Sequence, residues 1–362
     1  MKHLLLLGGG HAHVHVLRAF AQDPLAGVRV TLVSPFPRQM YSGMVPGLVA
    51  GHYAVDECVI PLAPLAQRAR AEFIESSAVR LDTAARQVTL ANAQVMSYDV
   101  LSVDTGPVMD RDAIPGAREH GLFVRPIEHF ARMWELLLAS AELHGLSVAV
   151  IGAGAAGVEL ALAIQYRLAD RARINLVTGG PEPLAEYPVP VQALARAALR
   201  RQGITVIEDS CAQITAQHVH LGGGTRLQCD APVLAIGSSA PAWLAGSGLA
   251  LDQHGFIATA LTLQSTSHPE VFAAGDVASS VALQRPKSGV FAVRAGPPLA
   301  LNLRRYLGAA ALQEHLPKLR SLNLLACGRR SAIVAWGSWS AQSALAWYWK
   351  DWIDRRFVAK YR

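Results

Sequence analysis

Two segments of the chain share one order of hydrophobic and small residues: an apolar run, a glycine turn and a pattern of helical period. The first reads HLLLLGGGHAHVHVLRAF at residues 3–20, and the second reads SVAVIGAGAAGVELALAI at residues 147–164. Each order predicts a strand, a tight turn and a helix, which is the unit of parallel sheets with crossover helices. The pattern therefore predicts an α/β protein that contains two such units.

The second glycine turn has the spacing GxGxxG, with Gly152, Gly154 and Gly157 at the three glycine positions. In dinucleotide-binding turns the first glycine permits the tight turn, the second lets the backbone approach a pyrophosphate, and the third lets the helix pack on its strand. The helix N-terminus at Ala155 and Ala156 is expected to face the anion. The alternative is a glycine-rich turn that binds no ligand.

The apolar run around this turn is long enough to resemble a membrane span, because residues 146–164 carry a single charge, at Glu159. The glycines interrupt the run, however, and predict a strand over residues 147–151 and a helix that begins near Ala155. We therefore expect these side chains to lie in a protein core rather than in lipid.

The first turn departs from this spacing at one position: Gly8 and Gly10 hold the first two places, and the third is His13. His11 and His15 share a face of the expected helix, so a metal site is the alternative. No cysteine or glutamate follows at ligand spacing. We therefore predict no metal but a phosphate-binding turn, formed by Gly8, Gly10, His11, Ala12 and His13.

Dinucleotide-binding folds usually carry an acidic residue where their second strand ends, to bind a ribose hydroxyl. Here the strand VRVTLVS ends at Ser34, before Pro35, and the strand RINLV is followed by Thr178. We expect these residues beside the nucleotides, but neither position offers an acid for a ribose or an arginine for a 2′-phosphate. The sequence therefore does not choose between NADH and NADPH.

Composition and charge limit the classes of partner. Hydrophobic residues make up 51% of the 362 residues and charged residues 17%, which is typical of a globular core. The net charge of +6 suits anionic ligands or an anionic membrane surface, and we find no nucleic-acid-binding motif. The four cysteines have no CxxC or CxxxxC spacing, so no redox-active dithiol and a reducing, cytoplasmic location are expected. The apolar N-terminal run is too short for a signal peptide.

Two dinucleotide turns imply two nucleotide cofactors, and FAD with NADH or NADPH is the economical pair. Three further motifs follow in order: LSVDTGP at residues 101–107, VLAIGSSAP at 233–241 and HPEVFAAGDVA at 268–278. With these motifs the chain resembles the two-dinucleotide-binding flavoproteins of the pyridine nucleotide–disulfide oxidoreductase superfamily. Type II NADH dehydrogenases and sulfide:quinone oxidoreductases look most similar, because they too lack the CxxxxC dithiol and carry a C-terminal extension.

A narrower resemblance covers nearly the whole chain. The segments GGGHAHVHV, YSGMVPGLVAGHY, RPKSGVFAVRAGPPLALNL and WKDWIDRRF are similar to the subfamily that is sometimes fused to selenide, water dikinase. The resemblance implies two nested Rossmann-like domains. An FAD domain would comprise residues 1–114 and 241–312, an inserted NAD(P)H domain residues 115–240, and a C-terminal amphipathic tail residues 313–362.

The resemblance also implies roles for individual residues. Lys287 would face the flavin and stabilise its anionic reduced form, and Glu159 would lie near the nicotinamide carboxamide. The alternatives are a surface lysine and a solvated acid on a helix, and an ordinary turn at residues 41–43. The other cofactor-binding residues that the resemblance implies are Tyr41, Ser42, Gly43, Thr105, Gly106, Gly237, Gly275 and Asp276.

The expected activity is hydride transfer from NAD(P)H to FAD, with the electrons passed on to a quinone or another small acceptor. Arg294 and Ala295 stand where type II NADH dehydrogenases carry glutamines, so a quinone site here would differ. Two alternatives stay open: a flavoenzyme that acts on sulfide or a selenium compound, with a degenerate nicotinamide site, and a non-enzymatic flavin-binding redox module. Cys58 and Cys327 fall outside the inserted domain, and lone cysteines are usually core residues.

Tryptophans concentrate near the C-terminus, in the segment WGSWSAQSALAWYWKDW. The helical period predicts a last helix whose apolar face carries Leu345, Trp349, Trp352, Ile353 and Phe357. Residues 347–362 are also rich in lysine and arginine, so this face suits a membrane surface, on the cytoplasmic side of the inner membrane. Docking on the protein's own core or on a second subunit is the alternative, and the oligomeric state stays open.

Overall fold

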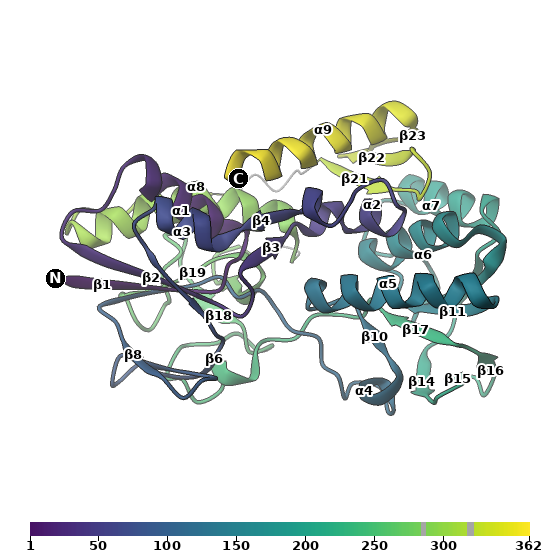
Figure 1. Cartoon of the computed structure of the whole chain (residues 1–362), viewed down its shortest axis with the longest axis horizontal. Coiled ribbons are helices and arrows are strands. Elements are labelled where there is room, and N and C mark those ends of the chain that lie inside the picture. The colour runs from purple at the N-terminus through teal and green to yellow at the C-terminus, as the bar shows by residue number, and fades with distance from the viewer. Residues whose placement is uncertain (284–286, 317–321) are drawn as a thin grey trace.

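Two five-stranded parallel sheets lie at the centres of the two halves of the molecule (Figure 1). The computed structural model describes residues 1–283, 287–316 and 322–362, so the start of the RPKSG motif and part of the tail lie outside the described residues. The first sheet has the order β19 (Val271–Ala273), β9 (Val100–Val103), β1 (Lys2–Leu7), β2 (Val28–Ser34), β5 (Glu72–Glu75). The second has the order β10 (Leu122–Phe123), β17 (Ala231–Leu234), β11 (Leu146–Ile151), β12 (Ala172–Val177), β13 (Thr205–Ile207).

The two sheets repeat one connectivity. The apolar runs that precede the glycine turns form the central strands, β1 and β11, and the next strands β2 and β12 pair with them on one side. The later strands β9 and β17 pair with them on the other side. Because the strand order reverses between β1 and β9 and between β11 and β17, ligands are expected at the carboxyl ends of these strands.

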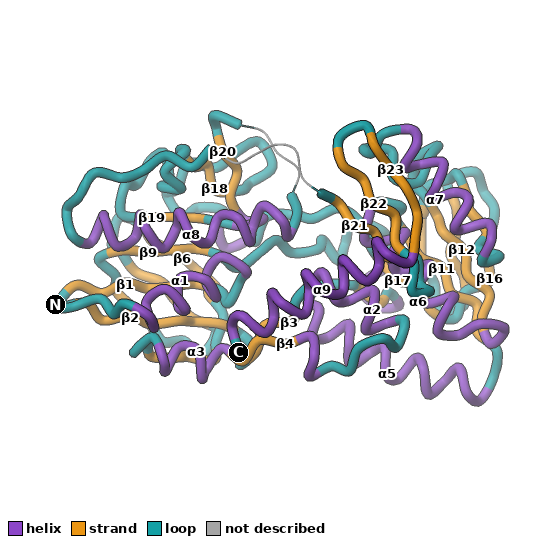
Figure 2. Tube along the Cα trace, turned by 90° about the horizontal axis from the view of Figure 1, so that it is seen from above, coloured by secondary structure: helices purple, strands orange, loops and turns teal. Residues whose placement is uncertain are grey.

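The glycine turns are followed by helices, as the sequence predicts. In the first half α1 packs against α8, at a point where a Cβ added to Gly296 would lie 2.6 Å from His15 Cβ (Figure 2). The absent side chain therefore lets the two helices approach closely. The longer helices are α1 (His11–Gln22), α5 (Ile127–Leu143), α6 (Ala155–Leu168), α7 (Val189–Arg201) and α8 (Gly289–Leu307).

The run that resembles a membrane span is strand β11 followed by helix α6, and the predicted break at the glycines is confirmed. Val148 and Val150 in β11 and Ala161 and Ile164 in α6 are fully buried in the core of the second half. Within the described ranges no helix has both the length and the apolarity to cross a bilayer.

Shorter elements complete the two halves. β18 and β20 are parallel, whereas the other small sheets are antiparallel. These elements are β3 (Arg38–Met40), β4 (Val59–Pro61), β6 (Ala78–Asp82), β7 (Gln87–Leu90), β8 (Val95–Ser97), β14 (Cys211–Ile214), β15 (His218–Leu221), β16 (Arg226–Gln228), β18 (Ile257–Thr259) and β20 (Ala278–Ser280), with helices α2 (Val45–Val49), α3 (Leu62–Arg68) and α4 (Ala117–His120).

The chain passes between the two halves at two adjacent points. Val108 and Ser239 form an antiparallel bridge, in which the Val108 amide donates to the Ser239 carbonyl at 2.9 Å and the Ser239 amide donates back at 2.8 Å. The outgoing and returning segments are therefore hydrogen-bonded to each other where they cross.

The C-terminal segment forms a three-stranded antiparallel sheet and one long helix, α9 (Ala344–Tyr361), which extends from the second half to the first (Figures 1 and 2). Trp347 near its start is buried against the sheet, whereas Tyr361 at its end is buried against the first half. The tail thus contacts both halves, and its strands are β21 (Asn323–Ala326), β22 (Ala332–Trp336) and β23 (Trp339–Ser343).

Candidate functional site

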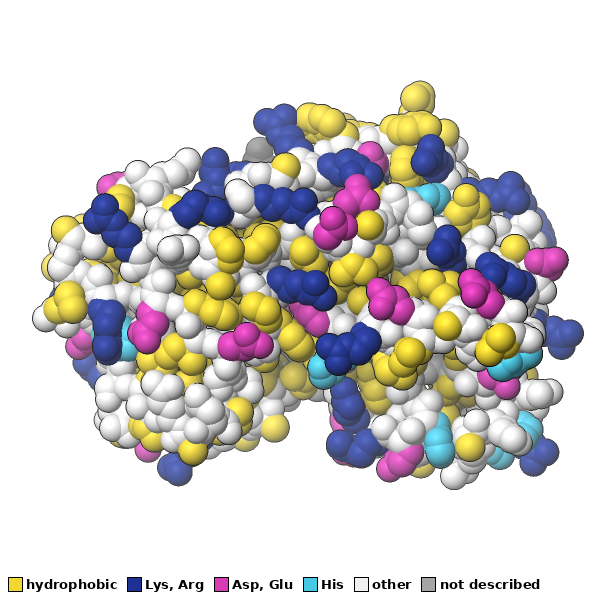
Figure 3. All heavy atoms as spheres, viewed as in Figure 1, with side chains coloured by type: hydrophobic (Ala, Val, Ile, Leu, Met, Phe, Trp, Pro, Cys, Tyr) yellow, Lys and Arg dark blue, Asp and Glu magenta, His cyan; other side chains and the backbone are white. Residues whose placement is uncertain are grey.

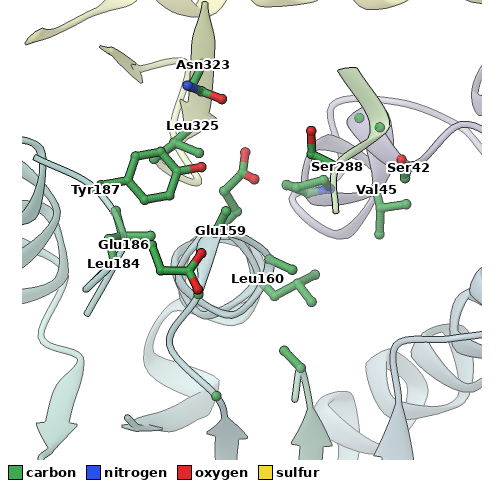
Figure 4. Close-up of a pocket in the computed structure, with 18 of the residues that line it drawn as sticks. Ser42, Val45, Glu159, Leu160, Leu184, Glu186, Tyr187, Ser288, Asn323 and Leu325 are labelled. Atoms are coloured by element: carbon green, nitrogen blue, oxygen red, sulfur yellow. The ribbon is translucent and has the colours of Figure 1, made fainter. Parts of the chain in front are cut away.

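A cavity of about 1010 Å³ lies between the two halves and beneath the tail. Its walls come from the turn after β11, the loop after β3, the start of α8, strand β21 and helix α9. Figure 4 shows Glu159 projecting from α6 into this space, between Tyr187 on one side and Ser288 and Ser42 on the other. Parts of the chain far apart in sequence therefore line one shared cavity.

The turn after β11 has the geometry that a dinucleotide requires. Gly152 has φ +102°, and a Cβ added to Gly157 would lie 1.8 Å from the Gly152 carbonyl oxygen. No atom lies within 4 Å of a Cβ added to Gly154, so the backbone is open there. Gly154 and the first residues of α6, Ala155 and Ala156, line the cavity, as does Gly237 beyond β17. The helix N-terminus is thus accessible to an anion.

Glu159 lies one turn further along α6. Its Oε1 accepts a hydrogen bond from the Ala326 amide of the tail strand β21 at 2.7 Å. Burial raises the pKa of Glu159 to about 7, although the nearby Lys350 ammonium opposes the shift. The carboxyl is therefore not a solvated acid on the outside of a helix, and it exchanges a proton near neutral pH.

The loop predicted to contact the flavin lies across the cavity from α6. Tyr41, Ser42 and Gly43 line the cavity together with Lys287. A Cβ added to Gly289, at the start of α8, would lie 3.3 Å from Ser42 Oγ, so the two segments are in close contact. The Lys287 ammonium donates to the Ala278 carbonyl at 2.8 Å.

The turn after β1 is built differently, although Gly8 has φ +91° just as Gly152 has a positive φ. His13 is fully buried at the third position, with its Nδ1 2.6 Å from the Gly8 carbonyl oxygen and its Nε2 2.8 Å from Ser102 Oγ. Because a carbonyl only accepts, Nδ1 carries the proton and Nε2 accepts from the hydroxyl. The imidazole thus joins the turn to β9, and burial lowers its pKa to about 4, which keeps it neutral.

A second buried group, Asp104, lies at the same turn. Its Oδ2 accepts from the amides of Ala12 at 2.8 Å and His13 at 2.9 Å, while its own carbonyl accepts from Gly10 at 3.1 Å. Cβ atoms added to Gly10 and Gly275 would lie 2.4 Å and 2.5 Å from Asp104 Oδ1. Two of the amides predicted to hold a phosphate therefore already donate to a carboxyl group.

Burial raises the pKa of Asp104 well above its usual range, and the nearby Asp276 carboxylate raises it further, while the two amide hydrogen bonds lower it. Asp276 itself, in the second FAD motif, lies 3.8 Å from the guanidinium of Arg125, which also lines the cavity. The surroundings of Asp104 thus favour its protonated form, beside an ion pair.

These residues fit FAD. Thr105 and Gly106 follow β9 next to Asp104, at the carboxyl end where a nucleotide is expected. His11 Nε2 is buried and has no hydrogen-bond partner among the described residues, which leaves a polar atom for a ligand to satisfy. Ser34 is buried at the end of β2, and Pro35 beyond it is exposed.

The histidines of the first turn do not form a metal site in the part of the chain that the structure describes. His11 packs against the stacked rings of Tyr41 and Phe357, whereas His15 Nδ1 lies 3.1 Å from the Tyr361 hydroxyl. Each ring is therefore part of the packing between α1, its neighbours and the tail.

The tail helix contributes a buried charged pair. Lys350 Nζ donates to Asp354 Oδ2 and to the Gly43 carbonyl, both at 2.6 Å, and Asp354 also hydrogen-bonds Tyr41. Burial alone would lower the pKa of Lys350, but the Asp354 and Glu159 carboxylates outweigh it and raise the pKa. This cation therefore holds α9 against the loop that is predicted to contact the flavin.

The predicted apolar face of α9 packs only in part. Phe357 stacks on the Tyr41 ring and Ile353 lines the cavity, whereas Leu345 is 80% exposed and Trp352 56%. The helix instead docks through a face that includes two charged residues, and it packs on the protein's own core. The residues of this docked face are Trp347, Lys350, Asp354, Val358 and Tyr361.

Several residues of the site escaped sequence reasoning. Asp104 and Arg125 stand in no dinucleotide fingerprint, and Lys350 and Asp354 looked like the polar side of an amphipathic helix. A usable signal existed only for Asp104: an acid immediately after an apolar strand, in LSVDTGP, stands where VLAIG has alanine. The predicted residue Thr178 lines the cavity, and its hydroxyl lies within hydrogen-bond distance of the carbonyl oxygens of Gly180 in its own loop and of Ile207 in β13.

Comparison with known proteins agrees with this fold. Residues 2–296 match the family described as pyridine nucleotide-disulphide oxidoreductase. The demethylphylloquinone reductase NdbB of Synechocystis is 25% identical over 286 residues, which cover 75% of this chain and 71% of that protein. The sulfide:quinone oxidoreductase of Aquifex aeolicus superposes with a TM-score of 0.83 at 19% identity, over 100% of this chain and 92% of that one.

The structure of NDH2 from Plasmodium falciparum in complex with NADH superposes with a TM-score of 0.80 at 12% identity, over 99% of this chain and 96% of that one. These likenesses confirm the predicted α/β class with two dinucleotide-binding folds. The chain belongs to the pyridine nucleotide-disulphide oxidoreductase family.

Proposed function

We propose that this protein is an FAD-dependent oxidoreductase that takes hydride from NADH or NADPH and passes the electrons to a quinone or a similar small acceptor. The observation that carries the proposal is the shared cavity, which joins the phosphate-binding turn at Gly154 to the loop at Ser42 and Gly43. A nucleotide on that turn and a flavin behind that loop would face each other directly. The name of the relative NdbB, a demethylphylloquinone reductase, supports a quinone as the acceptor.

FAD, when bound, supplies the redox chemistry: it accepts a hydride and releases electrons to an acceptor. The protein supplies position and charge. Lys287 and Lys350 bring two cations to the flavin side of the cavity, where they would stabilise negative charge. Glu159 can hold or release a proton near pH 7, as an acceptor that gains electrons requires.

No cysteine lies among the described residues that line the cavity. Cys58 and Cys327 are buried free thiols, and burial raises the pKa of each to about 12. Because the thiolate is the reactive form, these cysteines are poorly suited to attack a sulfur or selenium compound. This observation favours direct transfer to the acceptor over the chalcogen alternative.

We further propose that the outer face of α9 meets a membrane surface, from which a lipid-soluble quinone would reach the cavity. Leu345, Tyr348, Trp349 and Trp352 are exposed on it, next to Arg356 and Lys360. Figure 3 shows hydrophobic and basic side chains together along the edge that carries α9. Such a mixture of aromatic and basic residues suits an anionic interface.

Purified protein tests the redox proposal. FAD-loaded protein should lose its yellow colour when NADH or NADPH is added without oxygen, and a soluble quinone should restore the colour. Protein that holds FAD but stays yellow with both nucleotides would overturn the proposal. The membrane proposal is tested separately, by sedimentation with anionic vesicles: a variant with serine at Trp349 and Trp352 should bind less, and equal binding would count against it.

A further inference from the structure

We infer that Glu182 binds the ribose of the adenosine half of the nicotinamide nucleotide and makes the enzyme selective for NADH over NADPH. The inference rests on the proposed function, because it concerns the same cavity. It starts from the missing acid at the end of β12, where most dinucleotide folds bind this ribose.

The residue at that strand end is not available for the ribose. The Thr178 hydroxyl lies within hydrogen-bond distance of the carbonyl oxygens of Gly180 and Ile207, which compete for its single proton, and it accepts from the Gly180 amide at 3.3 Å. A hydroxyl has one proton and two lone pairs, so these contacts use most of its capacity. A side chain with more free acceptor capacity is therefore better placed to bind the ribose hydroxyls.

Glu182 stands four residues later in the same loop and lines the cavity beside Thr178, Gly179 and Gly180. Its Oε2 accepts from Arg196 Nε, and Arg196 Nη2 donates to the Pro181 carbonyl at 2.9 Å. The Arg196 guanidinium thus holds both the Glu182 carboxylate and the backbone of the same loop at Pro181. A carboxylate accepts through two oxygens, so Oε1 can receive the ribose hydroxyls while Oε2 holds the arginine.

The charges at this end of the cavity disfavour a 2′-phosphate. Arg196 is shared by two carboxylates, because its Nη2 also bonds Glu208 at 2.8 Å. Glu182 and Glu186 are the charged residues that the loop presents to the cavity, whereas the cations among the described lining residues come from other segments: Arg125, Lys287 and Lys350. A phosphate placed near Glu182 would face like charge without a spare cation.

Binding of non-reducing nucleotides to the FAD-loaded protein tests this inference independently of hydride transfer. Calorimetric titration with NAD⁺ and NADP⁺ should give an affinity for NAD⁺ at least about tenfold higher. Glu182→Gln keeps the size and one acceptor oxygen but removes the charge, and it should reduce that ratio about tenfold. Glu208→Gln is the matched control, since Glu208 also pairs with Arg196 but does not line the cavity; it should change the ratio less than about threefold.

Equal or tighter binding of NADP⁺ to the unmodified protein would overturn the inference. So would an unchanged ratio in Glu182→Gln, or equal losses in both variants, or no binding of either nucleotide. Failure of the flavin to bleach would instead contradict the proposed reaction while the binding ratio still reported on Glu182.

Discussion

The turn after β1 and the turn after β11 occupy equivalent places in two sheets of the same connectivity. In the second turn Gly157 brings the helix against the Gly152 carbonyl, and Ala235 follows the neighbouring strand. In the first turn His13 and Asp104 stand at the corresponding places, and both are buried and hydrogen-bonded. In the second turn the helix packs closely because small residues leave room for it. In the first turn two hydrogen-bonded polar side chains, His13 and Asp104, occupy the corresponding space.

The difference matters for ligand binding. The second turn leaves its helix amides open to an anion. In the first turn the amides of Ala12 and His13 both donate to Asp104 Oδ2, so Asp104 lies between these amides and a ligand. When protonated, Asp104 can donate a hydrogen bond from its other oxygen to a phosphate. Four changes would break or sharpen this contrast.

The largest effect is expected from Gly157→Ala. The new Cβ would lie 1.8 Å from a backbone oxygen that cannot rotate away, so the turn must distort. We expect a loss of about 3 kcal/mol in the free energy of unfolding, measured in urea, and loss of flavin bleaching by NADH. Gly154→Ala is the control for stability, because its Cβ would meet no atom within 4 Å. Equal stability of the two variants would contradict the role of Gly157.

His13→Ala should cost about 2 kcal/mol of the free energy of unfolding, since it leaves the Gly8 carbonyl and the Ser102 hydroxyl without their buried partner. Restoring the usual residue by His13→Gly should not recover the loss, because the space is shaped for a ring. A His13→Gly variant as stable and as rich in FAD as the original would show that the two turns are interchangeable.

Asp104→Asn should change the free energy of unfolding by about 1 kcal/mol at neutral pH. It should also change how that free energy depends on pH. Burial raises the pKa of Asp104 in the folded protein above the unfolded value, so its stabilising contribution is complete below about pH 3.9 and is lost as the pH rises through the folded pKa. FAD affinity, followed by flavin fluorescence, should likewise fall with rising pH. The amide variant should lack this trend, and a persisting trend would assign it to another group.

Glu159→Gln should have the smallest effect on stability, below about 0.5 kcal/mol, since the amide keeps an oxygen for the Ala326 amide proton. Its effect should lie in the pH profile of acceptor reduction. The pKa of Glu159 is about 7, so the rate in the original protein should fall as the pH rises through that value and depletes the protonated form. If Glu159→Gln shows the same pH profile of acceptor reduction as the original protein, Glu159 is not the proton donor.

The strand–turn–helix units could be predicted from the sequence because their signals are local. An apolar run, a glycine with positive φ and an amphipathic helix follow one another within about twenty residues. The expected strands at residues 28–34 and 147–151, and the helix from Ala155, are all present. Hydrophobic periodicity alone was sufficient there, since these elements bury apolar side chains.

The tail and the first turn could not be predicted in the same way. Helix α9 buries Lys350 and Asp354 and exposes Trp352, so the hydrophobic pattern identified only part of the packed face. The partners that make this burial tolerable, Gly43 and Tyr41, are about three hundred residues away in sequence. Likewise, the polarity of His13 is explained only by Ser102 and Gly8, which the fold brings to it.

The bridge between Val108 and Ser239 also bears on how such a chain could have arisen. Residues paired across an antiparallel bridge lie only about 5 Å apart, which is the span of an ordinary hairpin turn. The segment between these two residues can therefore be an insertion at a turn of a smaller nucleotide-binding fold, since its two ends lie as close together as the ends of a turn. A shortened chain that joins residue 108 to residue 239 through two glycines would restore such a turn.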